Sequence, residues 1–367
     1  MNKTKICFIS AYAYPLFNPK CKTTFGGSEV QMYQYANKLS KDQKYTVDFM
    51  VANFGQKKQE IINNIKVIKT FSLNRKGIFR YLYGLSAILK LLYILAKNNS
   101  DVYIQRAAGI ETGIIALYCK LFHKNYIYMT ASSIDTDGEY RHQNPLEGFI
   151  YEWGIKHATH IICQNHEQET NLQKKYNIKS TVIENSFNIP QRIFSQKNFV
   201  LWVGSAQTLK QPQIFLRLAK SFPQHQFIII IPKHNLLLWH EIRKKTRSIS
   251  NINFIEKVPF NKINKYFAKA KIFVNTSTYE GFPNTFVQAT MYSTPVISLN
   301  VNPDNFLYKN HCGFCAQNSF NRLKIYTQNL FTDNKLWQIM SKNSYDYAKK
   351  NHDINKNIVK LTNIINS

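Results

Sequence analysis

The fold is decided by a short apolar stretch, FVLWVG at residues 199–204, which follows a region without regular patterning. The preceding residues, ENSFNIPQ at 184–191, show neither a helical nor a strand period and are predicted to form a connector. Beyond residue 204, short β-branched and aromatic runs recur at 226–231, 272–275 and 295–298, separated by helical patterns. This alternation predicts a second α/β domain that begins near residue 199.

The residues before the connector show the same alternation. A helix is predicted over residues 28–39, opened by a capping box of Ser28 and Gln31. Strands are predicted at 5–10, 45–51, 65–70, 101–105, 125–129 and 160–164. The expected fold class is α/β, with two doubly wound, Rossmann-like domains that face each other across a ligand cleft.

The domain boundaries follow from the connector. We expect an N-terminal domain over residues 1–190 and a second domain over residues 191–345. The remaining residues, 346–367, have a helical pattern and are expected to form a C-terminal helix that packs back on the N-terminal domain.

Composition limits the function classes. The 367 residues include 44% hydrophobic and 14% aromatic residues, which excludes a largely disordered chain. Lys and Arg number 48 and Asp and Glu 21, so the net charge is +27. That excess is spread along the chain, and no zinc-finger, RNP-like or basic-zipper motif accompanies it, so we expect no nucleic-acid partner.

Six cysteines, at positions 7, 21, 119, 163, 312 and 315, mostly lie in apolar segments. The pair Cys312 and Cys315 has CxxC spacing, but no second ligand pair with matching spacing exists. Three histidines, His157, His160 and His166, straddle a helix-to-strand change. We therefore expect structural cysteines, no metal site and no cofactor.

The stretch at 74–97 is apolar on most faces, with basic residues at both ends. Two interpretations stay open: a core helix between two strands, or a helix that contacts an anionic membrane surface. No apolar run is long enough to cross a membrane, and the N-terminus is predicted to be a strand. The expected location is cytoplasmic, with peripheral binding to the inner face of the cell membrane as the second possibility.

The stretch most informative about function is TYEGFPNTFVQA at residues 278–289. Gly281 and Pro283 predict a tight turn, Asn284 a helix N-cap, and Thr285 the start of the helix. The free amides at such a helix N-terminus, here those of Asn284, Thr285 and Phe286, suit a diphosphate.

With this segment, the chain resembles the retaining glycosyltransferases of glycosyltransferase family 4, which have the GT-B fold. In that family, two glutamates eight positions apart flank the turn, one near the transferred sugar and one on the nucleotide ribose. Glu280 matches the first of them, and Gln288 stands at the second. An amide can still bond ribose hydroxyls, without the stronger charge-assisted bond.

A second matching segment is WVGSAQTLKQP at residues 202–212. The family has an arginine directly after the glycine and a lysine five positions beyond it, both on the donor diphosphate. Lys210 matches the lysine, and Ser205 stands at the arginine position. In the N-terminal domain, Gly26 and Gly27 match a glycine-rich loop that faces the donor phosphates and the acceptor.

Relatives also place a histidine near the end of the strand at 125–129. This chain has none there, and Asp135 is a candidate contact to the acceptor or the sugar. The resemblance thus implies Glu280 and Lys210 as catalytic residues, and Asp135 is added to them as a titratable group near the position of the missing histidine. The implied donor-binding residues are Gly26, Gly27, Ser205, Lys210, Glu280, Gly281, Phe282, Asn284, Thr285 and Gln288.

The resemblance implies the activity and the role of each domain. The N-terminal domain would be the acceptor side and the second domain would bind a nucleotide-diphosphate sugar. The expected reaction moves a hexose, with retention and without a metal, to a hydroxyl of a glycan or lipid-linked acceptor, of the lipopolysaccharide, capsule or exopolysaccharide type. The alternative is a GT-B-fold partner subunit that binds its ligand with little transfer, suggested by Ser205 and Gln288.

Overall fold

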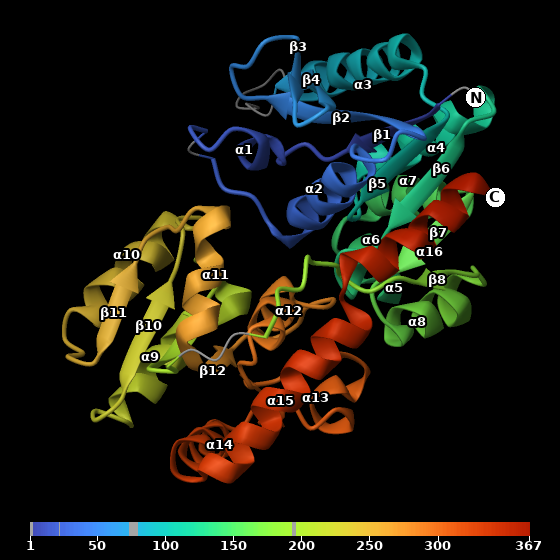
Figure 1. The fold of residues 1–367 in the computed structure, drawn as a ribbon. Coiled ribbons are helices and arrows are strands. Elements are labelled where there is room, and N and C mark those ends of the chain that lie inside the picture. Colours follow the sequence, from blue (N-terminus) through green and yellow to red (C-terminus); the bar gives the residue numbers. More distant parts are fainter. Residues whose placement is uncertain (1–2, 22, 73–79, 193–195) are drawn as a thin grey trace. The chain divides into compact units, whose positions relative to one another are not determined.

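The computed structural model describes residues 3–21, 23–72, 80–192 and 196–367. The chain divides into two compact units (Figure 1). Unit 1 comprises Met1–Ser186 and Ile354–Ser367, and unit 2 comprises Phe187–Asp353.

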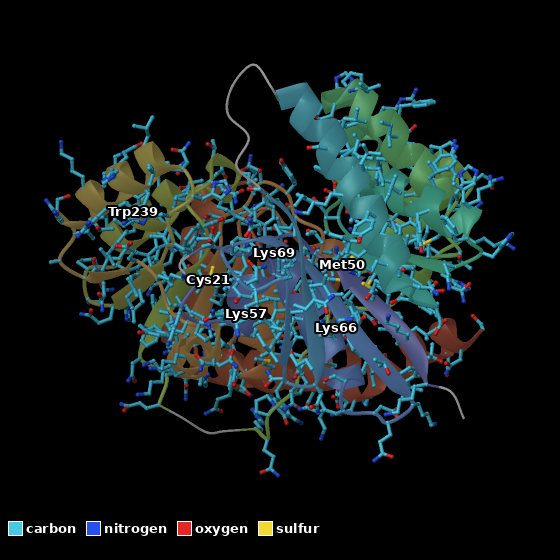
Figure 2. The ribbon with its side chains drawn as sticks, turned by 90° about the horizontal axis from the view of Figure 1, so that it is seen from above. Cys21, Met50, Lys57, Lys66, Lys69 and Trp239 are labelled. Atoms are coloured by element: carbon cyan, nitrogen blue, oxygen red, sulfur yellow. The ribbon has the colours of Figure 1, made fainter. Side chains whose placement is uncertain are left out.

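Unit 1 is built on an eight-stranded sheet in the order β3-β4-β2-β1-β5-β6-β7-β8. Neighbouring strands are parallel except for β3, which pairs antiparallel with β4. The strands are β1 (Thr4–Ile9), β2 (Tyr45–Asn53), β3 (Gln59–Ile62), β4 (Ile65–Ser72), β5 (Val102–Arg106), β6 (Asn125–Met129), β7 (His160–Cys163) and β8 (Thr181–Val182). Lys66 and Lys69 lie on β4, and Lys57 precedes β3 (Figure 2).

Helices cover both faces of this sheet. One face packs against α1 (Tyr14–Phe17), α2 (Gly27–Leu39) and the C-terminal helix α16 (Ile354–Asn366), whose Leu361 and Ile365 enter the same core. The other face packs against α3 (Arg80–Asn98), α4 (Ile110–Leu121), α7 (Pro145–Lys156) and α8 (His166–Tyr176). Two short helices, α5 (Ile134–Asp137) and α6 (Glu139–Gln143), follow β6.

Unit 2 has a six-stranded, fully parallel sheet in the order β11-β10-β9-β12-β13-β14. The strands are β9 (Phe199–Val203), β10 (Gln226–Ile230), β11 (Ile252–Ile255), β12 (Ala270–Asn275), β13 (Val296–Ser298) and β14 (Gly313–Cys315). The helices are η1 (Thr208–Lys210), α9 (Pro212–Lys220), α10 (Leu236–Thr246), α11 (Phe260–Lys269), α12 (Asn284–Met291), η2 (Pro303–Asn305), α13 (Phe306–Lys309), α14 (Phe320–Thr332) and α15 (Asn334–Asn351). Trp239 of α10 is fully buried in the core (Figure 2).

The predicted α/β class is confirmed in both units. Each predicted strand lies within two residues of an observed one, because a parallel strand with helices on both faces is apolar throughout. Four short strands were not predicted: β3, β8, β11 and β14.

The predicted capping box of α2 is wrong. The helix begins at Gly27, with Gly26 as the N-cap and Glu29 at the third position. The Glu29 carboxylate accepts a hydrogen bond of 2.8 Å from the Gly26 amide. Gln31 is instead fully buried, and its side chain accepts from the Ser186 amide at 2.7 Å.

The apolar stretch at 74–97 lies only partly inside the described residues, since 74–79 fall outside them. Over the described part of the chain, no helix is both long and apolar enough to cross a bilayer. Leu91 and Leu95 of α3 pack into the core of unit 1, whereas Leu85, Leu89 and Tyr93 are more than half exposed. The helix therefore has a core face and an exposed apolar face.

All six cysteines are free thiols, and Cys21 is the most exposed of them. Burial raises the pKa of Cys119, Cys163 and Cys312 to about 12, and that of Cys7 and Cys315 also rises. At pH 8 these five thiols are both buried and protonated. Because the thiolate is the reactive species, they should react slowly with thiol reagents.

We therefore expect a thiol reagent to modify one cysteine rapidly in the native protein and all six after unfolding. The measurement is a time course of absorbance with a disulfide reagent at pH 8. Cys21→Ala should remove the rapid phase. Rapid modification that persists in this variant, or a disulfide between Cys312 and Cys315, would contradict the burial of the CxxC pair.

Candidate functional site

The switch point of unit 2 lies between β9 and β12, which pair in parallel. The helices that follow these strands cover opposite faces of the sheet. Phe215 of α9 packs in the core that contains Ile272 and Val274, whereas Phe286 of α12 contacts the Phe273 ring from the other side. Such a divergence leaves a crevice at the carboxyl ends of the two strands, where open α/β sheets bind ligands.

Hydrogen bonds tie together the two loops that border this switch point. The Trp202 indole donates to the Thr276 hydroxyl at 2.9 Å, and that hydroxyl donates to the main-chain oxygen of Lys210 at 2.6 Å. The Thr278 amide donates to the Leu209 oxygen at 2.9 Å. The loop after β9 is therefore held against the loop after β12.

This connection brings Lys210 and Glu280 together, although they are 70 residues apart in sequence. Lys210 Nζ forms an ion pair with Glu280 Oε1, and the side chains are only 21% and 18% exposed. Ser277 Oγ donates to the same carboxylate oxygen at 2.8 Å. A cation that can hold a phosphate and a carboxylate that can face a sugar thus lie side by side at the switch point.

The N-terminus of α12 adjoins this pair. The helix begins at Asn284, so the residue predicted as its N-cap is its first helical residue, and Pro283 is the N-cap. Proline lacks an N–H and presets the backbone angle φ needed there. One part of the predicted amide set is wrong: the Phe286 N–H donates to the Pro283 oxygen at 2.9 Å and is already satisfied. Asn284 and Thr285 supply the first two helical amides.

Gly281 and Phe282 are both buried. Phe282 is 5% exposed, and its ring packs against Phe286, Phe306 and His352. In this packing the phenyl ring anchors the loop that carries Glu280. A contact of Phe282 to the donor stays a prediction.

The two residues that depart from the family pattern have local polar partners. Ser205 Oγ accepts from Gln207 Nε2 at 2.9 Å. Gln288 is 6% exposed, and its side-chain amide donates to Asn264 Oδ1 of α11 at 3.4 Å, a long bond. Gln288 therefore lies in α12, with its amide close to α11.

Gly26, Gly27 and Asp135 belong to unit 1. Gly26 and Gly27 begin α2 directly after the loop that follows β1. Asp135 is 2% exposed, and its Oδ2 accepts from the Ala131 and Ser132 amides and from the Tyr128 hydroxyl. Burial raises its pKa to about 6, against the opposing effect of these bonds. The carboxylate organises its own turn, and its contact to acceptor or sugar stays a prediction.

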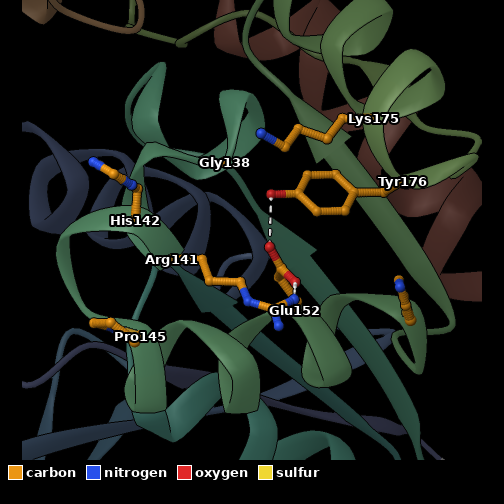
Figure 3. A pocket seen from close by; sticks show the side chains of 8 residues that line it. Gly138, Arg141, His142, Pro145, Glu152, Lys175 and Tyr176 are labelled. Carbon is orange, nitrogen blue, oxygen red and sulfur yellow. Dashed lines mark hydrogen bonds and ion pairs between the residues drawn. The ribbon is translucent and has the colours of Figure 1, made fainter.

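Unit 1 also holds a pocket of about 590 Å³ that the sequence did not indicate (Figure 3). Glu152 on its wall is almost buried, accepts from the Tyr176 hydroxyl at 3.2 Å and pairs with Arg141. The other lining residues are Gly138, His142, Pro145, Lys156 and Lys175. Residues from three helices and one turn build this pocket, so no local motif marks it.

A further residue that sequence reasoning missed is Arg106, the last residue of β5. The signal that could have found it is its position. Arg106 is a cation at the carboxyl end of β5, which pairs with β1, and these two strands form the switch point of unit 1. Among the described residues, no group of three or more His, Cys, Asp or Glu side chains is arranged to hold a metal ion.

Comparison with known proteins gives a family match for the part of the chain that holds Lys210 and Glu280. The family model described as Glycosyl transferases group 1 matches residues 184–347, which include the whole sheet of unit 2 and both loops of its switch point. A search of curated protein sequences gives no match.

Solved structures resemble the whole chain. Sucrose-phosphate synthase from Thermosynechococcus elongatus has a TM-score of 0.81 at 13% identity, and the match covers 99% of this chain and 98% of that one. Anabaena HepE, solved in complex with UDP, has a TM-score of 0.72 at 14% identity, with 99% and 100% covered. WaaG, a glycosyltransferase involved in lipopolysaccharide biosynthesis, has a TM-score of 0.69 at 14% identity, with 98% and 99% covered.

These structures share two Rossmann-like domains with the chain, and the family match covers the unit that holds Lys210 and Glu280. The chain therefore contains a glycosyl transferases group 1 domain, has the GT-B fold and is a glycosyltransferase.

Proposed function

We propose that the chain is a retaining hexosyltransferase that uses a nucleoside-diphosphate sugar. Its acceptor is a hydroxyl of a growing surface glycan or glycolipid, of the lipopolysaccharide, capsule or exopolysaccharide type. The observation that carries the proposal is the Lys210–Glu280 pair at the switch point of unit 2, beside the N-terminus of α12. The UDP bound to HepE and the lipopolysaccharide role of WaaG support the substrate classes.

In this proposal unit 2 binds the donor and unit 1 the acceptor. Lys210 and the amides of Asn284 and Thr285 hold the diphosphate, where negative charge grows as the sugar leaves. Glu280 faces the sugar and stabilises the positive charge that develops at its anomeric carbon. Gln288 bonds the ribose.

The chemical step needs no side-chain nucleophile. The bond between the anomeric carbon and the diphosphate oxygen breaks, and the acceptor oxygen bonds to that carbon on the same face. The acceptor proton passes to the departing diphosphate, which acts as the base. Retention of configuration follows from attack on the face that the leaving group vacates.

The first test is a panel of UDP-, GDP-, ADP-, dTDP- and CMP-sugars. We expect one nucleotide class to raise the melting temperature of the protein, since a ligand at 100 times its Kd stabilises by about 2.7 kcal/mol. The measurement is the melting temperature of the protein with each nucleotide sugar, obtained from thermal unfolding. If no nucleotide stabilises the protein, the donor assignment fails and the partner-subunit interpretation takes its place.

We also propose that unit 1 contacts an anionic membrane surface. The exposed face of α3 and the end of α4, two helices that pack together, combine apolar and basic side chains. The exposed members are Leu85, Leu89, Lys90, Tyr93, Lys97, Leu117, Lys120, Leu121 and Phe122. Apolar side chains that enter the lipid boundary beside lysines suit anionic headgroups.

We expect binding to vesicles of anionic phospholipid at low salt and release at high salt. Replacing Leu85 and Leu89 by serine should weaken binding by about 10-fold or more, because two apolar side chains no longer enter the lipid. The measurement is vesicle sedimentation, with Leu237→Ser, an exposed leucine of unit 2, as the matched control. Equal binding of the double variant and the control would exclude this face.

A further inference from the structure

Arg106 ends β5, and β5 pairs in parallel with β1. These two strands form the switch point of unit 1, because β1 leads to α2 on one face and β5 leads to α4 on the other. Arg106 therefore lies at the carboxyl edge of the sheet, where ligands of such sheets bind.

The Arg106 guanidinium is buried without a carboxylate counter-ion among the described residues. Arg106 is 7% exposed, and Nη2 donates to Asn185 Oδ1 at 2.7 Å. Its Nε is buried and has no hydrogen-bond partner. In the part of the chain that the structure describes, Arg106 forms no ion pair within 4.0 Å. Burial lowers its pKa to about 10, so the group is charged at neutral pH.

The nearest carboxylates do not neutralise it directly. Glu29 and Asp135 act on Arg106 only at longer range. Glu29 caps α2 through the Gly26 amide at 2.8 Å, and Asp135 accepts from the Ala131 amide at 2.7 Å. A buried cation that bonds a neutral amide and forms no ion pair among the described residues is unfavourable, and an anionic group supplied from outside would offset that cost.

The backbone beside Arg106 is also unusual. Ala107 has φ = +78°, a region that L-residues rarely adopt. Two bonds hold it there: its amide donates to the Met129 oxygen at 3.1 Å, and Gln105 Nε2 donates to its oxygen at 2.7 Å. Strain of this kind persists where the surroundings fix it, and it is typical of ligand-binding loops.

We propose that Arg106, at the carboxyl edge of the unit 1 sheet, binds an anionic group of the acceptor, either a phosphate or a carboxylate. The proposal rests on the proposed function, since the donor diphosphate is assigned to Lys210 in unit 2. The acceptor is then an acidic glycan or a phosphate-bearing lipid.

The test uses the full chain with Lys210→Ala, so that anion binding at Lys210 does not contribute. Inorganic phosphate and glucuronate are the probes, titrated at constant ionic strength and followed by melting temperature. We expect both or one of them to stabilise the protein, and Arg106→Gln to weaken this binding by about 10-fold or more.

Asn185 offers a matched pair of variants. Asn185→Asp places a carboxylate at the partner of Arg106 and competes with the probe, so binding should weaken by about 10-fold. Asn185→Ala removes the bond to Arg106, and the bond from Asn185 Nδ2 to Gln164 Oε1, without adding charge, so affinity should stay within about twofold. Equal effects of the two variants would show a structural role and would overturn the proposal, as would probes that fail to stabilise the Lys210→Ala protein.

Two further arms identify the source of the anion and separate this proposal from the proposed function. Octyl glucuronide and octyl phosphate, compared with neutral octyl glucoside, show whether carboxylate or phosphate is bound. Nucleotide binding by the parent protein is measured in parallel. If Arg106→Gln loses nucleotide binding, Arg106 belongs to the donor site and the acceptor role is overturned. If the parent protein binds no nucleotide, the proposed function alone is overturned.

Discussion

Replacing Lys210 by alanine is expected to lower kcat/KM for sugar transfer by about 10²–10³-fold. Removal of one donor that stabilises developing charge in a partly enclosed site has an effect of this size. Ser205 stands at the position where relatives have an arginine, so no second cation of that motif replaces the lysine. The measurement is steady-state transfer with the nucleotide sugar selected by the stability panel.

The fold of the loop should survive this change. Thr276 bonds the main-chain oxygen of residue 210, and that bond does not depend on the side chain. The control is Lys245→Ala, which breaks an exposed ion pair with Glu241 on α10. Equal loss of activity in both variants, or full activity in Lys210→Ala, would contradict the proposed diphosphate site.

Replacing Glu280 by glutamine is expected to separate binding from transfer. Transfer should fall about 100-fold, because the neutral amide no longer stabilises positive charge at the anomeric carbon. The affinity for the nucleoside diphosphate alone should rise a few-fold, because Lys210 is then free of its carboxylate partner. Calorimetric titration of the nucleotide and initial rates of transfer measure the two effects.

Glu256→Gln is the control for this second prediction. Glu256 pairs with Lys233, and both side chains are about half exposed, so the substitution should change neither quantity. A Glu280→Gln protein that loses nucleotide affinity in proportion to its activity would show that Glu280 holds the donor in its ground state. That result would contradict the account in which Lys210 leaves the Glu280 carboxylate and binds the diphosphate.

The sequence predicted the strands that are buried on both faces, since their patterns need no long-range information. It missed β3, β8, β11 and β14, which have two to four residues each and are defined by their neighbours. The start of α2 was misplaced because a glycine N-cap gives no side-chain signal. The Glu29 carboxylate caps that helix by accepting a hydrogen bond from the Gly26 amide.

Glu280 and Lys210 were predicted as site residues through the family resemblance, but their pairing was not predicted. That contact depends on the bonds of Trp202 and Thr276, which join loops far apart in sequence. Arg106 carries no motif of its own. Its burial without a counter-ion becomes visible only when β1, β5 and Asn185 are brought together by the fold.

The central claim is that the donor diphosphate binds at Lys210 beside the N-terminus of α12. The most direct test is a crystal structure of the full chain with the nucleoside diphosphate that the panel selects. The account predicts phosphate oxygens within hydrogen-bond distance of Lys210 Nζ and of the Thr285 amide, with Glu280 released from the lysine. A nucleotide bound elsewhere, with the Lys210–Glu280 ion pair intact, would contradict it.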